Sequence, residues 1–354
     1  MVFDPISLLN FHLKKYISLN VPDIKSDEKP GILLNSNENA LGSPLINWYH
    51  RFPAKEHKAV NSSLAAIKKV SSQNFILGNG KYESIDLLLK LFCNPGIDQI
   101  IAISPDEMNY EDIAILCNVG VFNVPLLPDF HLDLIHIEQV ENVHSKIIFI
   151  GSPNHISGNA MHREDILMVL NNFNGLVVID ETYVNFSRQK SYLAELQDYP
   201  NLIILQSFDI AWGLADLQVS MTFASEKIIQ LMQRFKLSRG LSIPVANLLL
   251  KALEEVGMVN DMIKELVQMR AALKRVLEKF PFIVTVYPSD ANFLLVKMND
   301  AETVFDFLLQ KGILVKNVSH KMNCENCLRI TVGTEEENTQ LIEALVEYYD
   351  LSKQ

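Results

Sequence analysis

The sequence has 354 residues, of which 31 are Lys or Arg and 42 are Asp or Glu, so its formal net charge is −11 at pH 7. This acidic balance argues against a broad nucleic-acid footprint and against attachment to an anionic membrane, because both need an excess of clustered basic residues. Hydrophobic residues make up 48% and charged residues 21%, which is typical of a globular chain with two domains or one large one.

Targeting and redox signals are sparse. No run of 18 uncharged apolar residues occurs, so we expect no transmembrane helix. The first ten residues lack a basic segment followed by a long apolar stretch, so we expect no signal peptide. The four cysteines are too few and too scattered for a disulfide framework, which favours the reducing cytoplasm.

The middle of the chain alternates helical patterns with short apolar runs. Apolar residues at helical spacing predict helices over 82–92 and 226–235. The runs at 145–152, 175–180 and 201–207 are β-branched and almost continuously apolar, as in strands covered on both faces. Strands that alternate with helices indicate a parallel sheet with right-handed crossovers.

The last third of the chain has a different character. A long helical pattern over 246–279 precedes a series of short strands and helices. We predict strands at 282–287, 292–298, 313–315 and 328–332, a helix at 301–311, and a closing helix at 335–351. This order indicates a smaller α/β domain with the long helix as its connector.

Polar residues follow the three central strands at the edge where their carboxyl ends meet. Ligands of open parallel sheets bind at this edge. Asp180 can hold a pyridinium N–H, while Asn154 and Tyr183 can hydrogen-bond a phenolate oxygen. These residue types therefore suit a polar aromatic ligand.

Here the sequence begins to resemble a family, the fold-type I pyridoxal-phosphate aminotransferases, and within them the histidinol-phosphate aminotransferases. The resemblance is carried by motifs that follow the family's order along almost the whole chain. They are residues 34–42 (LNSNENALG), 51–53 (RFP), 80–85 (GKYESI), 152–158 (SPNHISG), 179–183 (IDETY), 292–293 (NF) and 328–334 (LRITVGT). Each motif is weak alone, and their order and spacing together are specific.

The resemblance implies an α/β fold with a three-layer large domain, built on a mainly parallel sheet, and a smaller C-terminal α/β domain. It implies an N-terminal arm with part of the small domain at 1–44, the large domain at 45–255 and the small domain at 256–354. It also implies a homodimer in which residues 51–53 lie near the partner's site.

The resemblance further implies site residues for pyridoxal phosphate or pyridoxamine phosphate. Asp180 would hold the pyridine nitrogen and keep it protonated, and Asn154 and Tyr183 would contact the ring oxygen O3′. The helix start after Gly80 would receive the phosphate. The substrate would meet Asn292, Lys316 and Arg329, with Arg329 pairing with the α-carboxylate. Alternatively, Asp180 and Tyr183 cap a helix, Arg329 forms a structural ion pair, and Lys316 is a solvated lysine.

The segment that carries the family's catalytic lysine departs from its pattern, S-x-S-K-A-x-G-L-A-G-x-R-x-G. Residues 207–220 read SFDIAWGLADLQVS and align without a gap. Ile210 therefore stands at the position of the Schiff-base lysine, with Ser207 retained before it. Asp209 replaces a phosphate-binding serine and Gln218 a phosphate-binding arginine. Two glycines of the pattern are also replaced, by Asp216 and Ser220.

These replacements act directly on the chemistry. Isoleucine forms no Schiff base and transfers no proton. Loss of the arginine removes a charge-assisted hydrogen bond of about 1.5–3 kcal/mol. An ionised Asp209 about 4 Å from a phosphate charge would repel it by roughly 4 kcal/mol at an effective dielectric near 20, unless the carboxylate became protonated.

Three further positions belong to the same comparison. Phe52 lacks the hydroxyl of the family's tyrosine, and Tyr110 is a candidate substitute for the aromatic that stacks on the cofactor ring. Lys81 either restores one positive charge to the phosphate loop or is an exposed lysine at a helix start. His320 with Cys324 and Cys327 hints at a metal site, but a fourth ligand is missing, so we predict no metal.

Two functions are compatible with this pattern. The first is a catalytically degenerate descendant of the family that binds a ligand or a partner protein. The second is an enzyme that uses the cofactor non-covalently on an amino acid or amino-phosphate substrate. The chemistry of Ile210 argues against conventional transamination, and a metal or nucleic-acid protein has little support.

Overall fold

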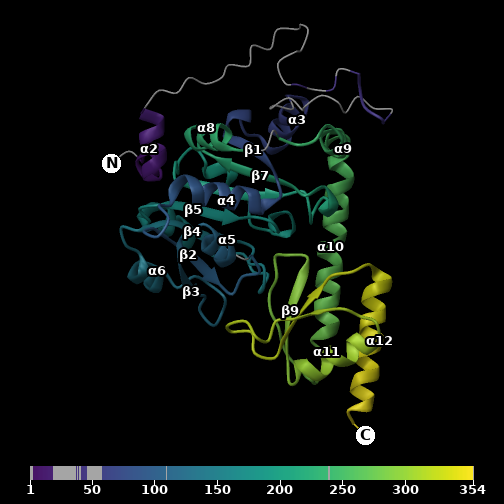
Figure 1. Cartoon of the computed structure of the whole chain (residues 1–354). Coiled ribbons are helices and arrows are strands. Elements are labelled where there is room, and N and C mark those ends of the chain that lie inside the picture. Colours follow the sequence, from purple (N-terminus) through teal and green to yellow (C-terminus); the bar gives the residue numbers. More distant parts are fainter. Residues whose placement is uncertain are drawn as a thin grey trace.

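The computed structural model describes residues 3–18, 37, 39, 41–45, 58–108, 110–237 and 240–353 (Figure 1). The motif at 51–53, with Phe52, and most of the motif at 34–42 lie outside these residues. Within the described ranges no helix is both long and apolar enough to cross a membrane.

A seven-stranded sheet forms the centre of the large domain. Its strand order is β1-β7-β6-β5-β4-β2-β3, and only β7 runs antiparallel to its neighbours. The strands are β1 (Phe75–Asn79), β2 (Gln99–Ser104), β3 (Gly120–Pro125), β4 (Ser145–Gly151), β5 (Leu176–Asp180), β6 (Leu202–Ser207) and β7 (Val219–Ala224). The three strands predicted from apolar runs are β4, β5 and β6, side by side at the centre.

Helices cover both faces of this sheet. They are α1 (Pro5–Leu8), α2 (Phe11–Ser18), α3 (Lys58–Lys68), α4 (Lys81–Phe92), α5 (Tyr110–Leu116), α6 (Leu134–Val140), α7 (Arg163–Asn172), α8 (Glu226–Phe235) and α9 (Ile243–Glu254). On β5, Val177 and Ile179 belong to one buried apolar cluster, whereas Leu176 and Val178 belong to another. Because alternate side chains point to opposite faces, both faces are buried, which explains the continuously apolar sequence.

The small domain is built on a four-stranded antiparallel sheet of order β10-β11-β9-β8. Its elements are β8 (Ile283–Val286), β9 (Phe293–Met298), α11 (Ala301–Gln310), β10 (Lys316–Asn317), β11 (Cys327–Thr331) and α12 (Glu335–Leu351). Helix α10 (Val256–Leu277) runs from the large domain to this sheet (Figure 1). Its Val259 and Ile263 join a core cluster of the large domain, and its Leu273 and Leu277 join the small-domain core. The helix therefore connects the two domains, as predicted.

The two sheets confirm the predicted fold class, and two details of the prediction are wrong. The helix predicted over 246–279 is two helices, because Glu255 leaves helical geometry at φ −97° and ψ 23°. Gly257, a poor helix former, follows at once. The predicted domain boundary at 255/256 stays a prediction and coincides with this break. The strand predicted at 313–315 lies instead at Lys316–Asn317, where the chain pairs with β11.

Candidate functional site

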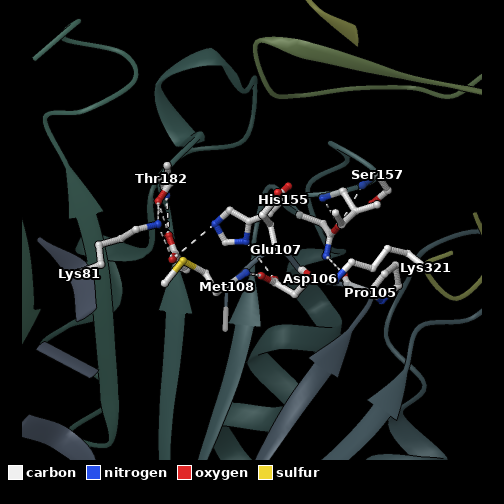
Figure 2. Close-up of polar contacts among 12 residues, drawn as sticks. Lys81, Pro105, Asp106, Glu107, Met108, His155, Ser157, Thr182 and Lys321 are labelled. Carbon is white, nitrogen blue, oxygen red and sulfur yellow. Dashed lines mark hydrogen bonds and ion pairs between the residues drawn. The ribbon is translucent and has the colours of Figure 1, made fainter. Parts of the chain in front are cut away.

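The residues predicted to form the site come together at the carboxyl edge of β4, β5 and β6. Asp180 is the last residue of β5, Asn154 lies in the loop after β4, and Ser207 ends β6. Asp180 and Asn154 are fully buried, and Ser207 nearly so. Lys81, the first residue of α4, follows the loop after β1 and faces this edge. Figure 2 shows the polar contacts in this region.

Lys81 forms an ion pair with Asp180. Its Nζ lies 2.9 Å from Asp180 Oδ2 and donates a hydrogen bond to Thr182 Oγ1. The side chain of Lys81 is 11% exposed and that of Asp180 is 0% exposed. Burial alone would raise the pKa of Asp180, but Lys81 and His155 outweigh it and hold that pKa well below its usual range. Lys81 is thus paired with the carboxylate that the resemblance assigns to a pyridine nitrogen.

His155 joins the same chain of charges. Its Nδ1 lies 2.9 Å from Asp106 Oδ2, and its Nε2 lies 3.5 Å from Asp180 Oδ2. Burial opposes protonation, yet the two carboxylates raise the pKa of His155 to about 9. A protonated histidine therefore stands between two carboxylates at neutral pH, in the series Asp106, His155, Asp180, Lys81. The sequence carried no spacing signal for His155 beyond its place beside Asn154 at a strand end.

Asn154 shapes the loop in which it lies. Its Oδ1 accepts hydrogen bonds from the backbone N–H groups of Ile156 and Ser157 and from the Ser157 hydroxyl. Its Nδ2 donates to the carbonyl of Pro105 at 3.0 Å. The side chain therefore holds the loop after β4 against the loop after β2.

The two candidate tyrosines are in different surroundings. Tyr183 makes edge contacts with His155 and Phe293, at ring-centroid distances of 5.5 and 5.2 Å, and burial raises its pKa to about 12. Tyr110 stacks on Phe149 with ring centroids 4.5 Å apart. Its hydroxyl is buried and has no hydrogen-bond partner among the described residues. Both tyrosines are therefore held by packing.

The segment at the lysine position contains an apolar residue beside a carboxylate. Ile210 packs against the core cluster on one face of the large sheet. The backbone N–H of Asp209 donates a long hydrogen bond to Ser207 Oγ, and Asp209 Oδ1 is buried without a partner in the described chain. Burial raises the pKa of Asp209, and the Ser207 side chain and Lys81 only partly oppose this.

Because this carboxylate is poorly compensated, Asp209→Asn is expected to raise the free energy of unfolding at pH 7 by about 1 kcal/mol. Urea unfolding monitored by circular dichroism measures the change. Asp216→Asn, at an exposed position in the same segment, is the matched control and should stay within about 0.5 kcal/mol of the parent. An Asp209→Asn variant less stable than the parent would show that the carboxylate is compensated.

The predicted phosphate loop is contacted by the side chain of Ser220. Ser220, at a glycine position of the family pattern, donates a hydrogen bond from Oγ to the carbonyl of Gly80 at 2.9 Å. A Cβ on Gly78 would lie only 2.7 Å from this Oγ, so a larger residue at 78 would force the Ser220 side chain to move. Gly80 has φ +82°, and Gln218 is exposed in a left-handed conformation beside it.

The three residues predicted to meet substrate lie in the small domain. Arg329 and Lys316 face each other across β11 and β10, and both form ion pairs with Glu107 of the large domain. Arg329 also donates to the carbonyl of His155. The backbone of Asn292 accepts from Val332, so this residue joins the end of β11 to the start of β9. Arg329 thus forms an ion pair with Glu107, a partner that the sequence did not reveal, and its role toward a substrate stays a prediction.

The Cys324 and Cys327 thiols are buried, and burial raises the pKa of both, to about 12 and about 11. Across the described ranges, no group of three or more His, Cys, Asp or Glu side chains is arranged to hold a metal ion.

Taken together, the donor groups at this edge do not fit pyridoxal phosphate. Asp180 is already paired with Lys81, the predicted phosphate position holds the Asp209 carboxylate, and position 210 supplies no amine.

Residues 29–345 match the family model for aminotransferases of class I and II. The chain therefore belongs to this family. Within it, the chain is 37% identical over 350 residues to a histidinol-phosphate aminotransferase of Cytophaga hutchinsonii, covering 98% of this chain and 100% of that protein. It is 38% identical over 341 residues to the histidinol-phosphate aminotransferase of Parabacteroides distasonis, covering 94% and 98% of the two chains.

Solved structures show the same fold. The histidinol-phosphate aminotransferase of Clostridium acetobutylicum superposes with a TM-score of 0.78 at 21% identity, covering 86% of this chain and 92% of that one. The enzyme of Sinorhizobium meliloti, solved in complex with pyridoxal-5′-phosphate, gives a TM-score of 0.77 at 18% identity and covers 90% of each chain.

Proposed function

We propose that this chain is a histidinol-phosphate aminotransferase-like protein that is catalytically degenerate and acts by binding a ligand or a partner protein. The observation that carries the proposal is the ion pair between Lys81 and Asp180, at 2.9 Å in a buried setting. An aminotransferase of this family needs that carboxylate for the cofactor. Here a side chain of the protein itself already satisfies it.

The chemistry of the neighbouring positions supports the same proposal. Ile210 has no amine with which to bind an aldehyde or to move a proton. Asp209 brings a negative charge to the position predicted for a phosphate dianion, and Gln218 brings no positive charge to oppose it. Ser220 closes on the carbonyl of Gly80 in the predicted phosphate loop. Three separate requirements are therefore unmet at one edge of the sheet.

The second candidate is an enzyme that holds pyridoxal phosphate or pyridoxamine phosphate without a covalent bond and acts on an amino acid or amino-phosphate. The observation in its favour is the grouping of Asn154, Asp180 and Tyr183, three residue types of the family pattern, around one buried edge. It requires Lys81 to leave Asp180, which would expose a buried carboxylate until the cofactor arrived.

Titration with pyridoxal phosphate separates the two candidates. The purified protein is titrated while its near-ultraviolet and visible absorption is recorded, then treated with borohydride and digested for mass spectrometry. We expect no saturable absorption change and no modification of a pocket lysine. A phosphopyridoxyl group fixed on Lys81 would contradict the degenerate function, and saturable binding without any fixed lysine would favour the second candidate. Lys81→Met is the matched control for mapping.

A reversion series asks how much of the ancestral site persists. Asp209→Ser, Ile210→Lys and Gln218→Arg are combined, with and without Lys81→Met. We expect cofactor binding to appear only when Lys81→Met is included, because the Lys81 ammonium otherwise competes for Asp180. Recovered transamination would show that the remaining residues suffice.

The same preparations, measured by light scattering after size-exclusion chromatography, test the proposed homodimer.

A further inference from the structure

A cavity of about 480 Å³ lies beside the loop that follows β4, between the large and the small domain. Its large-domain walls are His131 before α6, residues 159–164 at the start of α7, and residues 188–189 between β5 and β6. Pro288 and Asp290, between β8 and β9, complete the lining from the small domain. None of the described residues predicted to hold the cofactor or the substrate lines this cavity.

Asp290 joins the walls of the cavity. Its backbone N–H donates to the carbonyl of Gly158 at 2.7 Å, and its Oδ2 accepts from the backbone N–H of Ala160 at 3.2 Å. Its Oδ1 accepts a longer hydrogen bond, of 3.5 Å, from the backbone N–H of Arg188. The Asp290 carboxylate is therefore already hydrogen-bonded by two neighbouring wall segments.

The two arginines of the cavity differ in their partners. Arg163 pairs with Glu195, donates to the carbonyl of Lys190 at 3.0 Å, and lies over the Tyr192 ring at 4.4 Å from its centroid. Arg188 is exposed, and its guanidinium has no carboxylate within 4 Å in the described part of the chain. Arg188 is therefore the cation that the cavity leaves available to a ligand.

The charges around Arg188 act in both directions. Burial lowers the pKa of the neighbouring Arg270, while Asp290 opposes this shift and Arg188 adds to it. Glu164 is exposed in the first turn of α7, where the helix dipole stabilises an acidic side chain. An anion in the cavity would thus be attracted by Arg188 and repelled by Glu164.

Two imidazole rings form another part of the wall. The rings of His131 and His162 stack with centroids 3.6 Å apart and an interplanar angle of 9°. Burial and His162 lower the pKa of His131, while Asp129 and Asp165 oppose the shift. Among the described residues, Nδ1 of His131 has no hydrogen-bond partner, and the His162 side chain does not cap α7. The pair therefore brings incompletely hydrogen-bonded nitrogen atoms to the wall.

We propose that this cavity binds a small organic oxyanion, whose charged group pairs with Arg188 and whose body packs against Pro288 and the imidazole pair. A guanidinium matches a carboxylate or a phosphate in a bidentate pair. The volume lies within the range of about 300–1,000 Å³ found for small-molecule sites, so it accommodates more than a bare ion. The proposal goes beyond the proposed function, which concerns the edge of β4, β5 and β6, and does not depend on it.

Calorimetric titration of the full chain with benzoate and with phenyl phosphate tests the site. We expect saturable binding of at least one of these anions and none of benzyl alcohol, which keeps the ring without the charge. The tighter probe identifies the charged group as a carboxylate or a phosphate ester. Arg188→Gln is expected to weaken binding about tenfold to a hundredfold, through loss of a charge-assisted hydrogen bond. Arg275→Gln, at an exposed position on α10, is the matched control and should bind like the parent.

A second variant is expected to bind more tightly, which misfolding could not produce. Glu164→Gln removes the repelling carboxylate and should strengthen binding about twofold to fivefold, the range of one exposed charge interaction. Glu111→Gln, at an exposed position on α5, should show no gain. Hydrogen–deuterium exchange locates the ligand, and we expect the tighter probe to slow exchange at 159–164 and 188–190 but not at 316–329.

Four results would each overturn the proposal. They are the absence of saturable binding by both anions, equal binding of benzyl alcohol, equal affinity of Arg188→Gln and Arg275→Gln, and protection confined to residues 316–329. A weaker affinity of Glu164→Gln would replace the anion with a ligand that also carries a positive charge. None of these measurements uses pyridoxal phosphate, so their failure is distinct from a positive cofactor titration, which would overturn the proposed function.

Discussion

Replacing Lys81 with methionine is expected to lower the free energy of unfolding at pH 7 by about 3–5 kcal/mol, the range found when one partner of a buried ion pair is removed. The substitution keeps the length of the side chain and deletes its charge. Asp180, whose side chain is 0% exposed, then keeps only His155 as a charged partner, at 3.5 Å. Urea unfolding monitored by circular dichroism measures the loss, and thermal unfolding followed by calorimetry measures it independently.

Two variants make this result specific. Lys90→Met deletes an ion pair with Asp86 whose side chains are 60% and 41% exposed, so it should cost no more than about 1 kcal/mol. Combining Lys81→Met with Asp180→Asn removes both charges and should recover much of the stability. A Lys81→Met loss no larger than that of Lys90→Met would mean that this ion pair does not hold the site together.

Much of the fold could be predicted from the sequence, because hydrophobic patterning reports burial directly. The apolar runs that became β4, β5 and β6 have no polar alternation, and only strands covered on both faces satisfy that pattern. The positions of Asn154 and Asp180 followed, since each lies at or just after the end of such a strand. Strand ends are fixed by local sequence, and parallel strands bring their ends to one edge.

The partners of these residues could not be predicted in the same way. Lys81 was placed correctly at a helix start, but both a solvated and a buried lysine are compatible with that position. Its contact with Asp180 joins residues that are 99 positions apart. Glu107 and Arg329 are likewise 222 positions apart. Such contacts depend on how loops pass over the sheet, and loop conformation leaves little trace in periodicity.

The contacts of Lys81 and His155 show where positive charge lies at the site. Against the family pattern, Lys to Ile, Arg to Gln and Ser to Asp each subtract one charge, which makes three. Lys81 and protonated His155 return two of them, both beside Asp180. The positive charge has therefore moved from the predicted phosphate and lysine positions to the carboxylate that a pyridinium would need. These two cations compensate the buried Asp180 carboxylate.

The stability conferred by His155 is expected to disappear as pH rises from about 6.5 to above 9. Its pKa is about 9 in the folded protein and about 6.5 in an unfolded chain. A group with a raised folded pKa contributes its full stability below the unfolded value and loses it as pH passes the folded value. A difference of about 2.5 pH units corresponds to roughly 3 kcal/mol.

The measurement compares the parent with His155→Gln by urea unfolding at intervals between pH 6 and pH 10. Groups that titrate in both proteins cancel in the difference, so the stability gap between them should narrow by about 3 kcal/mol over this interval. Asp106→Asn removes the carboxylate 2.9 Å from Nδ1. The difference in unfolding free energy between Asp106→Asn and the Asp106→Asn/His155→Gln double variant should therefore narrow less, and at lower pH. A gap that stays constant with pH would show that His155 is neutral between its two carboxylates, which would leave Lys81 as the sole cation on Asp180.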